Sequence, residues 1–194
     1  MNRSTRPEPA ERLVYASVVE GLLRHGLRAG ERTPRLTARL RQIGVDVERP
    51  LLPAYPVTTW FHCMWAVIEE VYPGLPPEQA FRLLATRHAE GYGRTVVGRA
   101  LYVVARLLGP RRMAQRLPDM LGSGDNYTRA EMVERGPGDY EMQMNSEVHA
   151  PGYAESLIEA LLRLSGAHEP QVRVLSQGSG HTRYALRWQQ GRAP

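Results

Sequence analysis

The stretch from Gly91 to Met120 constrains the fold of this chain most strongly. Apolar residues recur here at steps of four, three and four, which places them on one stripe of an α-helix: Val97, Leu101, Val104 and Leu108. Gly109-Pro110 ends this helix because proline cannot continue it, and a second short helix follows through Met113 and Leu117. The pattern predicts two consecutive helices whose apolar stripe is buried in a core.

Arginine flanks this stripe at six positions: Arg94, Arg99, Arg106, Arg111, Arg112 and Arg116. Two interpretations are open. In the first, which we favour because runs of charge usually face solvent, the arginines form the outer side of a core helix pair. In the second, the basic face binds an anion or an acidic protein partner, since arginine holds a carboxylate with two parallel hydrogen bonds. The residues for such a partner are Arg99, Arg106, Arg111 and Arg112.

The composition is that of one folded domain. The chain has 194 residues, of which 42% are hydrophobic. No apolar run reaches membrane-spanning length, so we expect no membrane partner. Residues 1–9 are charged and rich in proline, which predicts a disordered lead without a signal segment. The single cysteine, Cys63, excludes an internal disulfide and a multi-cysteine metal site, and we expect a cytoplasmic location.

The chain is basic, with a net charge of +5 and an isoelectric point of about 9.7. All 25 basic residues are arginine, and lysine is absent. Together with abundant alanine, glycine and proline, this bias indicates a GC-rich genome and not selection for phosphate contacts. A clear reading helix or a basic strand face with stacking aromatics is also missing. We therefore expect no specific nucleic-acid binding, and keep binding through the region Arg82–Arg116 as an alternative.

The first half of the chain carries helical patterns. We expect helices at Glu11–Arg28, after a Thr33-Pro34 cap, from Thr58 or Thr59 to about Tyr72, and from Pro76-Pro77 onward. Gly91 and Gly93 are interpreted as a helix break, and Gly98 as a close contact between helices. Together these patterns predict a helical lobe over residues 10–121.

After Leu121 the pattern alternates with a period of two. Strands are expected at Tyr127–Glu134, Tyr140–Asn145, Gln171–Ser176 and Thr182–Trp188, with a helix opened by Pro151 between the two hairpins. Residues 122–190 are thus predicted to form a β-hairpin, helix, β-hairpin lobe. The fold class is α+β: an N-terminal helical lobe packed on a C-terminal four-stranded antiparallel sheet crossed by one helix, within one compact domain.

Aromatic and polar residues of the helical half are candidates for a ligand site between the lobes. They are Trp60, Met64, Trp65, His88, Tyr92, Arg94, Arg99 and Tyr102. Small-molecule sites combine apolar walls with a few polar groups, which favours a sensory or interaction module that binds a small apolar or anionic ligand. The alternative is that these residues only fill the core.

An enzyme built on His88, Tyr92 and Arg94 is the runner-up, but no nucleophile or acid–base pair accompanies these residues. The six histidines show no metal-ligand spacing on one helix. His62 and Cys63 are adjacent on a helix, so their side chains diverge by about 100° and do not face one site. No glycine-rich loop follows a strand. We expect a non-catalytic protein with neither metal nor cofactor.

The C-terminal order of hairpin, helix and hairpin resembles the second half of haem nitric oxide/oxygen-binding (H-NOX) domains. In those domains the strand before the helix carries a Tyr-x-Ser-x-Arg motif that holds the haem propionates. The matching stretch here is Met144-Asn145-Ser146-Glu147-Val148, in which only the serine agrees. A proximal histidine is expected about thirty residues earlier, and the chain has no histidine between His88 and His149. The resemblance therefore implies an H-NOX-like fold without haem.

The whole chain also resembles a family of myxobacterial paralogues of about 200 residues with no established function. The similarity spans roughly residues 12–189. It is carried by short motifs: Val19-Glu20-Gly21-Leu22, Gly44-Val45-Asp46, Leu52-Pro53-Ala54-Tyr55-Pro56 with Trp60, Gly91-Tyr92-Gly93-Arg94-Thr95 with Gly98-Arg99, and Tyr184 to Trp188. This family has no assigned catalytic residues, so the resemblance adds none to the candidates above.

Overall fold

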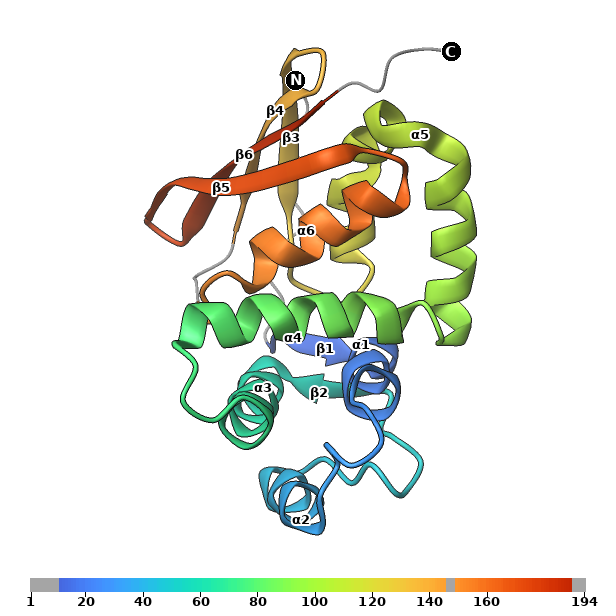
Figure 1. The fold of residues 1–194 in the computed structure, drawn as a ribbon, viewed down its shortest axis with the longest axis vertical. Coiled ribbons are helices and arrows are strands. Elements are labelled where there is room, and N and C mark those ends of the chain that lie inside the picture. Colours follow the sequence, from blue (N-terminus) through green and yellow to red (C-terminus); the bar gives the residue numbers. More distant parts are fainter. Residues whose placement is uncertain (1–10, 146–148, 190–194) are drawn as a thin grey trace.

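In the computed structural model, which describes residues 11–145 and 149–189, the chain begins with helices and ends with a four-stranded sheet (Figure 1). This architecture confirms the predicted α+β class. The lead predicted for residues 1–9 lies outside the described residues. Among the helices of the described part, none is long and apolar enough to cross a membrane.

The first described element is a strand, so the helix predicted from Glu11 to Arg28 is wrong at its start, although residues 16–26 are helical. β1 (Leu13–Tyr15) pairs antiparallel with β2 (Ala54–Pro56), the segment before α3. α1 (Ala16–Glu20) then continues into a π-helical turn, η1 (Gly21–Gly26). Over Leu13–Tyr15 the helical periodicity is overridden because pairing with a distant extended segment satisfies the backbone groups of these residues.

Two further helices complete the first layer. α2 (Pro34–Ile43) begins as predicted: the Thr33 side chain accepts a hydrogen bond from the backbone N–H of Leu36, and Gly44 ends the helix with φ 110°. α3 (Val57–Val71) begins directly after Pro56, without a side-chain cap. The predicted cap at Thr58 or Thr59 is therefore wrong, because both residues already lie inside the helix.

α4 (Pro77–Tyr92) passes through the middle of the molecule, between the N-terminal helices and α6 (Figure 1). Gly91 does not break this helix, contrary to the prediction, and Gly93 caps it. Gly91 is required for another reason. A Cβ atom there would lie 2.0 Å from the carbonyl oxygen of Gly21 and 2.4 Å from the amide nitrogen of Gly26. The backbones of α4 and η1 therefore touch at this glycine.

α5 (Val96–Gly122) consists of two helical arms that meet at a kink. Gly109 leaves the helical conformation with φ 73° and ψ 166°, and Pro110 follows it, which confirms the predicted helix end. We call residues 96–108 the first arm and residues 110–122 the second arm. The first arm runs along one edge of the molecule (Figure 1).

The predicted burial of the apolar stripe on the first arm is wrong for its two valines, whereas Leu101 and Leu108 are half-buried. Val97 and Val104 are 45% and 52% exposed, whereas Gly98 and Ala105 are buried. A Cβ atom at Gly98 would lie 1.9 Å from the carbonyl oxygen of Tyr92, which confirms the close contact predicted at this glycine. The arm packs closely through its small residues, so its valines and Leu107 remain on the outside.

The C-terminal half contains the predicted sheet, in the order β3-β4-β6-β5 with every neighbouring pair antiparallel. Its strands are β3 (Ala130–Gly136), β4 (Asp139–Met144), β5 (His168–Gly178) and β6 (His181–Gln189). α6 (Tyr153–Leu164) connects the two hairpins and packs on β5. The predicted inward face of β4 is confirmed, because Tyr140, Met142 and Met144 are all buried.

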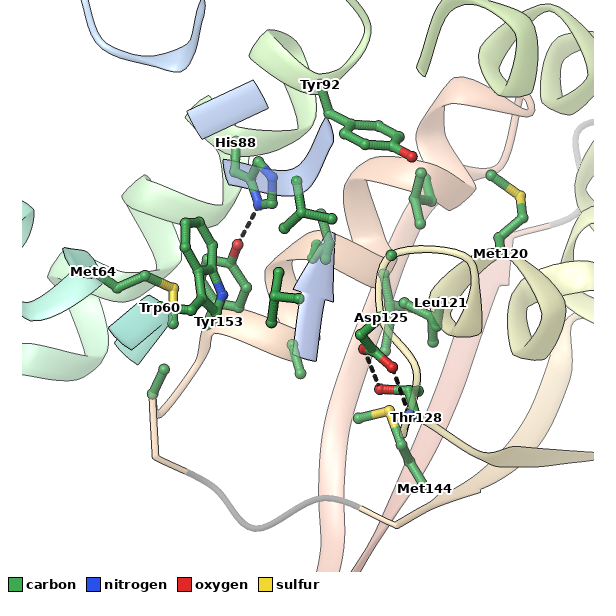
Figure 2. A pocket seen from close by; sticks show the side chains of 18 of the residues that line it. Trp60, Met64, His88, Tyr92, Met120, Leu121, Asp125, Thr128, Met144 and Tyr153 are labelled. Atoms are coloured by element: carbon green, nitrogen blue, oxygen red, sulfur yellow. Dashed lines mark hydrogen bonds between the residues drawn. The ribbon is translucent and has the colours of Figure 1, made fainter. Parts of the chain in front are cut away.

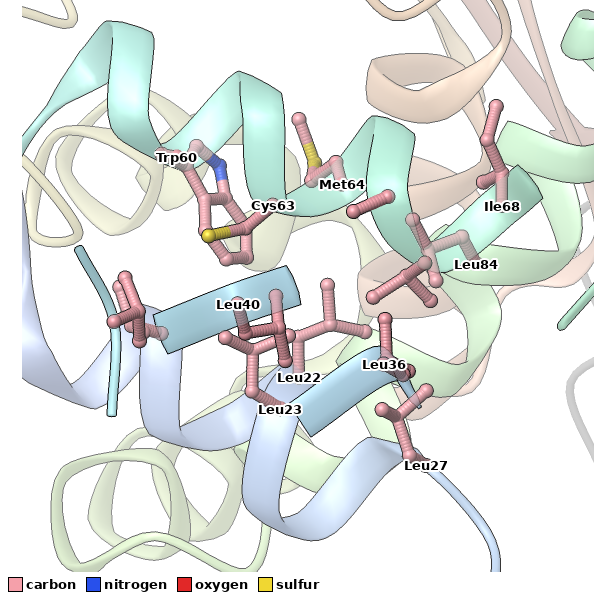
Figure 3. Close-up of a cluster of buried hydrophobic side chains, with 14 of the residues drawn as sticks. Leu22, Leu23, Leu27, Leu36, Leu40, Trp60, Cys63, Met64, Ile68 and Leu84 are labelled. Atoms are coloured by element: carbon pink, nitrogen blue, oxygen red, sulfur yellow. The ribbon is translucent and has the colours of Figure 1, made fainter. Parts of the chain in front are cut away.

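Two hydrophobic cores stabilise the fold. The first joins α1, η1, α2, α3 and α4, and includes Leu22, Leu36 and Cys63 (Figure 3). The second joins α5, α6 and the inner face of the sheet. Met113 and Leu117 of the second arm belong to this second core, so it reaches back into the half predicted to be the helical lobe. The boundaries at residues 10–121 and 122–190 stay a prediction.

Candidate functional site

A cavity of about 210 Å³ lies where the two cores meet, and its wall is mostly apolar (Figure 2). Side chains from both halves of the chain contribute, among them Trp60, Met64, Leu101, Met120, Leu121 and Met144. α3, α4 and the first arm of α5 supply one side, and the Asp125–Thr128 loop, β4 and α6 supply the other. The cavity therefore exists only because the two halves pack together.

The principal polar feature of the wall joins α4 to α6. The Nδ1 atom of His88 is hydrogen-bonded to the hydroxyl of Tyr153. His88 is only 4% exposed, and burial lowers its pKa from 6.5 to about 4, so the ring is neutral at neutral pH. Burial raises the pKa of Tyr153, so this phenol keeps its proton. A neutral imidazole beside a phenol accepts at one nitrogen, which assigns the Tyr153 O–H as the donor.

The ring of His88 also interacts with the backbone of Val18 in α1. The Val18 backbone opposes the fall in the pKa of His88 that burial causes. The Nε2 atom of His88 nevertheless makes no hydrogen bond of standard geometry with the described residues. The His88 ring also lies 5.6 Å from the ring of Trp60 between centroids. His88 is thus held on three sides by Tyr153, Trp60 and α1.

Asp125 forms the polar part of the opposite wall. Its carboxylate accepts hydrogen bonds from the Thr128 backbone and hydroxyl, each at 2.6 Å, and from the Tyr127 backbone at 2.9 Å. Burial raises the pKa of Asp125, and these hydrogen bonds oppose that rise. Because the Asp125 carboxylate accepts hydrogen bonds from its own loop, its main role is to hold the shape of this wall and not to bind a ligand.

The end of α4 and the first arm of α5 add two tyrosines. Tyr102 donates a hydrogen bond to the backbone carbonyl of Ala89 at 2.7 Å, and its ring centroid lies 6.1 Å from that of Tyr92. Burial raises the pKa of both phenols, so both are neutral. The two rings complete an aromatic corner next to His88.

Five of the eight candidate residues line this cavity: Trp60, Met64, His88, Tyr92 and Tyr102. The other three lie outside it. Trp65 packs edge-on against Phe81, with ring centroids 4.9 Å apart. Arg94 points to the backbone carbonyl of His25, and Arg99 lies exposed on the outer side of the first arm.

Several lining residues were not among the candidates. Tyr153, Asp125 and Met120 come from the C-terminal half and from the end of α5. No local sequence signal marks these residues. Tyr153 follows a proline–glycine turn, Asp125 follows a glycine-rich loop, and Met120 lies at an ordinary helix end. Only tertiary packing brings them to the cavity.

The structure does not bring together the three residues of the catalytic site that the sequence offered as an alternative. Arg94 lies outside the cavity, so it does not converge with His88 and Tyr92. Cys63 is buried, and desolvation raises its pKa to about 12, which suppresses the reactive thiolate. Within the described residues, no group of three or more histidine, cysteine and acidic side chains is placed to hold a metal ion.

The ionisable side chains around the cavity do not favour an anion. Among the described residues of its wall, Asp125 and Glu155 are acidic, and no arginine is present. Glu155 is 7% exposed, and burial raises its pKa. Its Oε2 atom has no hydrogen-bond partner among the described residues. An anionic ligand would therefore meet acids and not the basic residues that stabilise anions.

Comparisons with known proteins agree with this fold. The family DUF2378, described as proteins of unknown function, matches residues 12–189. A search of the curated proteins finds no relative of this chain. Among solved structures, a point variant of the Tt H-NOX domain superposes with a TM-score of 0.68 at 14% identity, over 93% of this chain and 97% of that one.

Two other solved structures are similar. An oxygen-binding H-NOX domain related to soluble guanylate cyclases has a TM-score of 0.64 at 13% identity, with 90% of this chain and 92% of that one covered. A structure from a study of haem redox potential and porphyrin distortion has a TM-score of 0.64 at 14% identity, with coverage of 89% and 98%. At such identity the likeness shows an H-NOX-like fold and nothing finer.

The residues of this cavity do not fit the haem that an H-NOX-like fold implies. The Nδ1 atom of His88 is already bonded to Tyr153, and α5 carries no histidine. Propionates would meet Asp125 and Glu155 instead of arginine. The volume of about 210 Å³ is also below the roughly 300–1,000 Å³ of ordinary ligand and cofactor sites. Ser146, the one residue that agrees with the propionate motif, lies outside the described residues.

Proposed function

We propose that this chain, which belongs to the DUF2378 family of proteins of unknown function, is a non-catalytic sensory module. Its ligand is a small, mostly apolar molecule with one hydrogen-bonding group, held between the two halves of the fold. The observation that carries this proposal is the apolar cavity at the junction of the two cores, with the His88–Tyr153 pair in its wall.

The size and lining of the cavity define the ligand class. An engineered apolar cavity of about 150 Å³ holds benzene, so about 210 Å³ accommodates a single ring with a short substituent. Aliphatic and aromatic side chains such as Trp60, Met64 and Leu121 favour an uncharged body. Of the two ligand classes expected from the sequence, the apolar one is supported, because the wall contains acids and no arginine among its described residues.

The position of the polar pair supports a sensory role. The hydrogen bond between His88 and Tyr153 joins α4 to α6, which carry the two halves of the cavity wall. A ligand whose polar group competes for the Tyr153 hydroxyl alters this contact between the halves. Such a ligand binds with different affinity to the two arrangements of the halves, with and without this hydrogen bond. A sensor requires that difference, because a ligand shifts a conformational equilibrium only by its differential affinity for the two states.

Indole is expected to bind in this cavity and to shift the ε-methyl NMR signals of Met64, Met120 and Met144, which line it. Met113 and Met142 are buried in the second core but do not line the cavity, so their signals serve as internal references. For a ligand of this size we expect a dissociation constant on the order of 0.1 to 1 mM. The measurement is a titration of protein labelled with 13C at the methionine methyl groups.

A cavity-filling variant tests whether the indole occupies this site. Ala154 lines the cavity on α6, so Ala154→Leu is expected to weaken indole binding by about tenfold or more. Ala160→Leu makes the same change on the same helix outside the cavity and should leave binding unchanged. Equal binding by the two variants would contradict the proposal, as would stoichiometric uptake of haemin with a histidine-dependent Soret band. Native mass spectrometry of the purified protein then identifies any ligand that it already carries.

A further inference from the structure

The outer face of the first arm of α5 exposes bulky aliphatic side chains that the fold does not bury. Leu107 is 80% exposed and Val96 is 77% exposed, followed by Val103, Val104 and Val97 at 56%, 52% and 45%. Single exposed apolar residues are ordinary on a protein surface, but contiguous patches mark interaction sites. Five such residues within twelve positions of one helix form a contiguous patch.

Helical geometry orders this face into two parallel rows. At 100° per residue, Val96, Val103 and Leu107 lie within about 40° of one another. Arg99 and Arg106 form a second row, about 70° to one side. The buried residues Gly98 and Ala105 lie on the opposite side of the same arm. The exposed face is therefore an apolar strip flanked by an arginine row, and we call it the α5 outer face.

The arginines of this face are available to a partner. Arg99 and Arg106 make no ion pair or side-chain hydrogen bond with any residue that the structure describes, and Arg106 is exposed like Arg99. From Gly91 to Pro118 the chain contains no aspartate or glutamate. Several other exposed arginines are paired, as Arg111 is with Glu134 at 3.2 Å. The charge of the α5 outer face is thus not neutralised within its own stretch of chain.

We propose that the α5 outer face binds an acidic amphipathic helix of a partner protein. Leucine-type side chains of that helix cover Val96, Val103 and Leu107, and a flanking row of carboxylates pairs with Arg99 and Arg106. Arginine suits this role because its planar fork holds a carboxylate with two hydrogen bonds. Helices that dock in this way present apolar anchors at spacings of three, four and seven residues.

Charge selects this occupant over the others. A second copy packed antiparallel through a two-fold axis would bring the same arginine row against itself, on a chain whose net charge is already +5. A membrane-surface helix carries its basic residues opposite its apolar face, whereas here the side opposite the strip is buried against the protein through Gly98 and Ala105. This inference does not depend on a ligand in the cavity.

The test uses the full chain and a fluorescein-labelled model helix with leucines on one face and glutamates beside them. In fluorescence anisotropy at about 0.15 M salt we expect micromolar binding of this peptide. A matched leucine and arginine peptide should not bind. Arg99→Glu combined with Arg106→Glu, and separately Leu107→Ser, should each weaken binding of the acidic peptide by about tenfold or more.

Matched controls come from exposed positions elsewhere. Arg32→Glu changes an exposed arginine that has no ion pair within the described residues, and Leu52→Ser changes a leucine that is 59% exposed. Both should bind the acidic peptide like the unaltered protein. The proposal fails if the peptide does not bind, or if these controls weaken it as much as the α5 variants. It also fails if Leu107→Ser instead abolishes self-association in sedimentation, or binding to anionic phosphatidylglycerol vesicles or duplex DNA.

Discussion

Gly91→Ala is expected to destabilise the protein by about 3 kcal/mol or more, which is a large part of the stability of a small domain. The added Cβ atom would lie 2.0 Å from the carbonyl oxygen of Gly21, and 2.4 Å and 2.7 Å from the backbone nitrogen and Cα of Gly26. All three are backbone atoms, so no side-chain rotation relieves the contact. α4 and η1 would have to separate, and this would open the first core.

Urea denaturation followed by circular dichroism measures this loss as a lower transition midpoint. Gly136→Ala is the matched control, because a Cβ atom at Gly136 meets nothing within 4 Å. We expect that variant to change the unfolding free energy by less than about 1 kcal/mol. If Gly91→Ala unfolds at the same urea concentration as the unaltered protein, the contact between α4 and η1 is not as close as described.

The sheet could be predicted from the sequence because its pattern and its burial coincide. Tyr140, Met142 and Met144 alternate with polar residues, and a period of two assigns them to one face of a strand. The other side of β4 has polar residues, so only one orientation of the strand buries the apolar set. Such a strand pairs in one register, which is why the antiparallel hairpins were predictable, whereas the pairing of β4 with β6 comes from the structure.

The first arm of α5 could not be predicted in the same way. Its aliphatic stripe through Val97 and Val104 has helical spacing, and such stripes usually face a core. The packed side is instead set by Gly98 and Ala105, because only small residues allow the close approach to Tyr92. Periodicity identifies the helix correctly but does not say which face is buried when another face can pack more closely.

β1 illustrates a second limit. Residues near Val14 have helical periodicity, but they become a strand because Tyr55 and its neighbours, about forty positions later, pair with them. The cavity shows the same limit. Trp60, Met64 and His88 stand out on their own helices, whereas Tyr153 and Asp125 reach the site only through the packing of the two halves. Local pattern therefore predicted one wall of the cavity, and tertiary structure supplies the other.

The unfolding free energy is expected to fall by about 3 kcal/mol between pH 7 and pH 4 through His88 alone. Burial lowers the pKa of this histidine to about 4 in the folded protein, against an ordinary value of 6.5. Between these two values the unfolded chain binds more protons than the folded one, so stability is full above about pH 6.5 and decreases as the pH falls. Below about pH 4 both states are protonated and the loss is complete.

His88→Gln isolates this contribution, because glutamine fills part of the same space and does not titrate. The measured quantity is the unfolding free energy of the unaltered protein minus that of the variant, at several pH values from 7 to 4. This difference should shrink by about 3 kcal/mol over that range as His88 is protonated on unfolding. His62→Gln, at an exposed histidine of α3, is the matched control and should follow the unaltered protein. A difference between the protein and His88→Gln that stays constant with pH would mean that His88 is protonated in the folded state as readily as in water. In that case it could not be the buried, neutral hydrogen-bond acceptor of Tyr153.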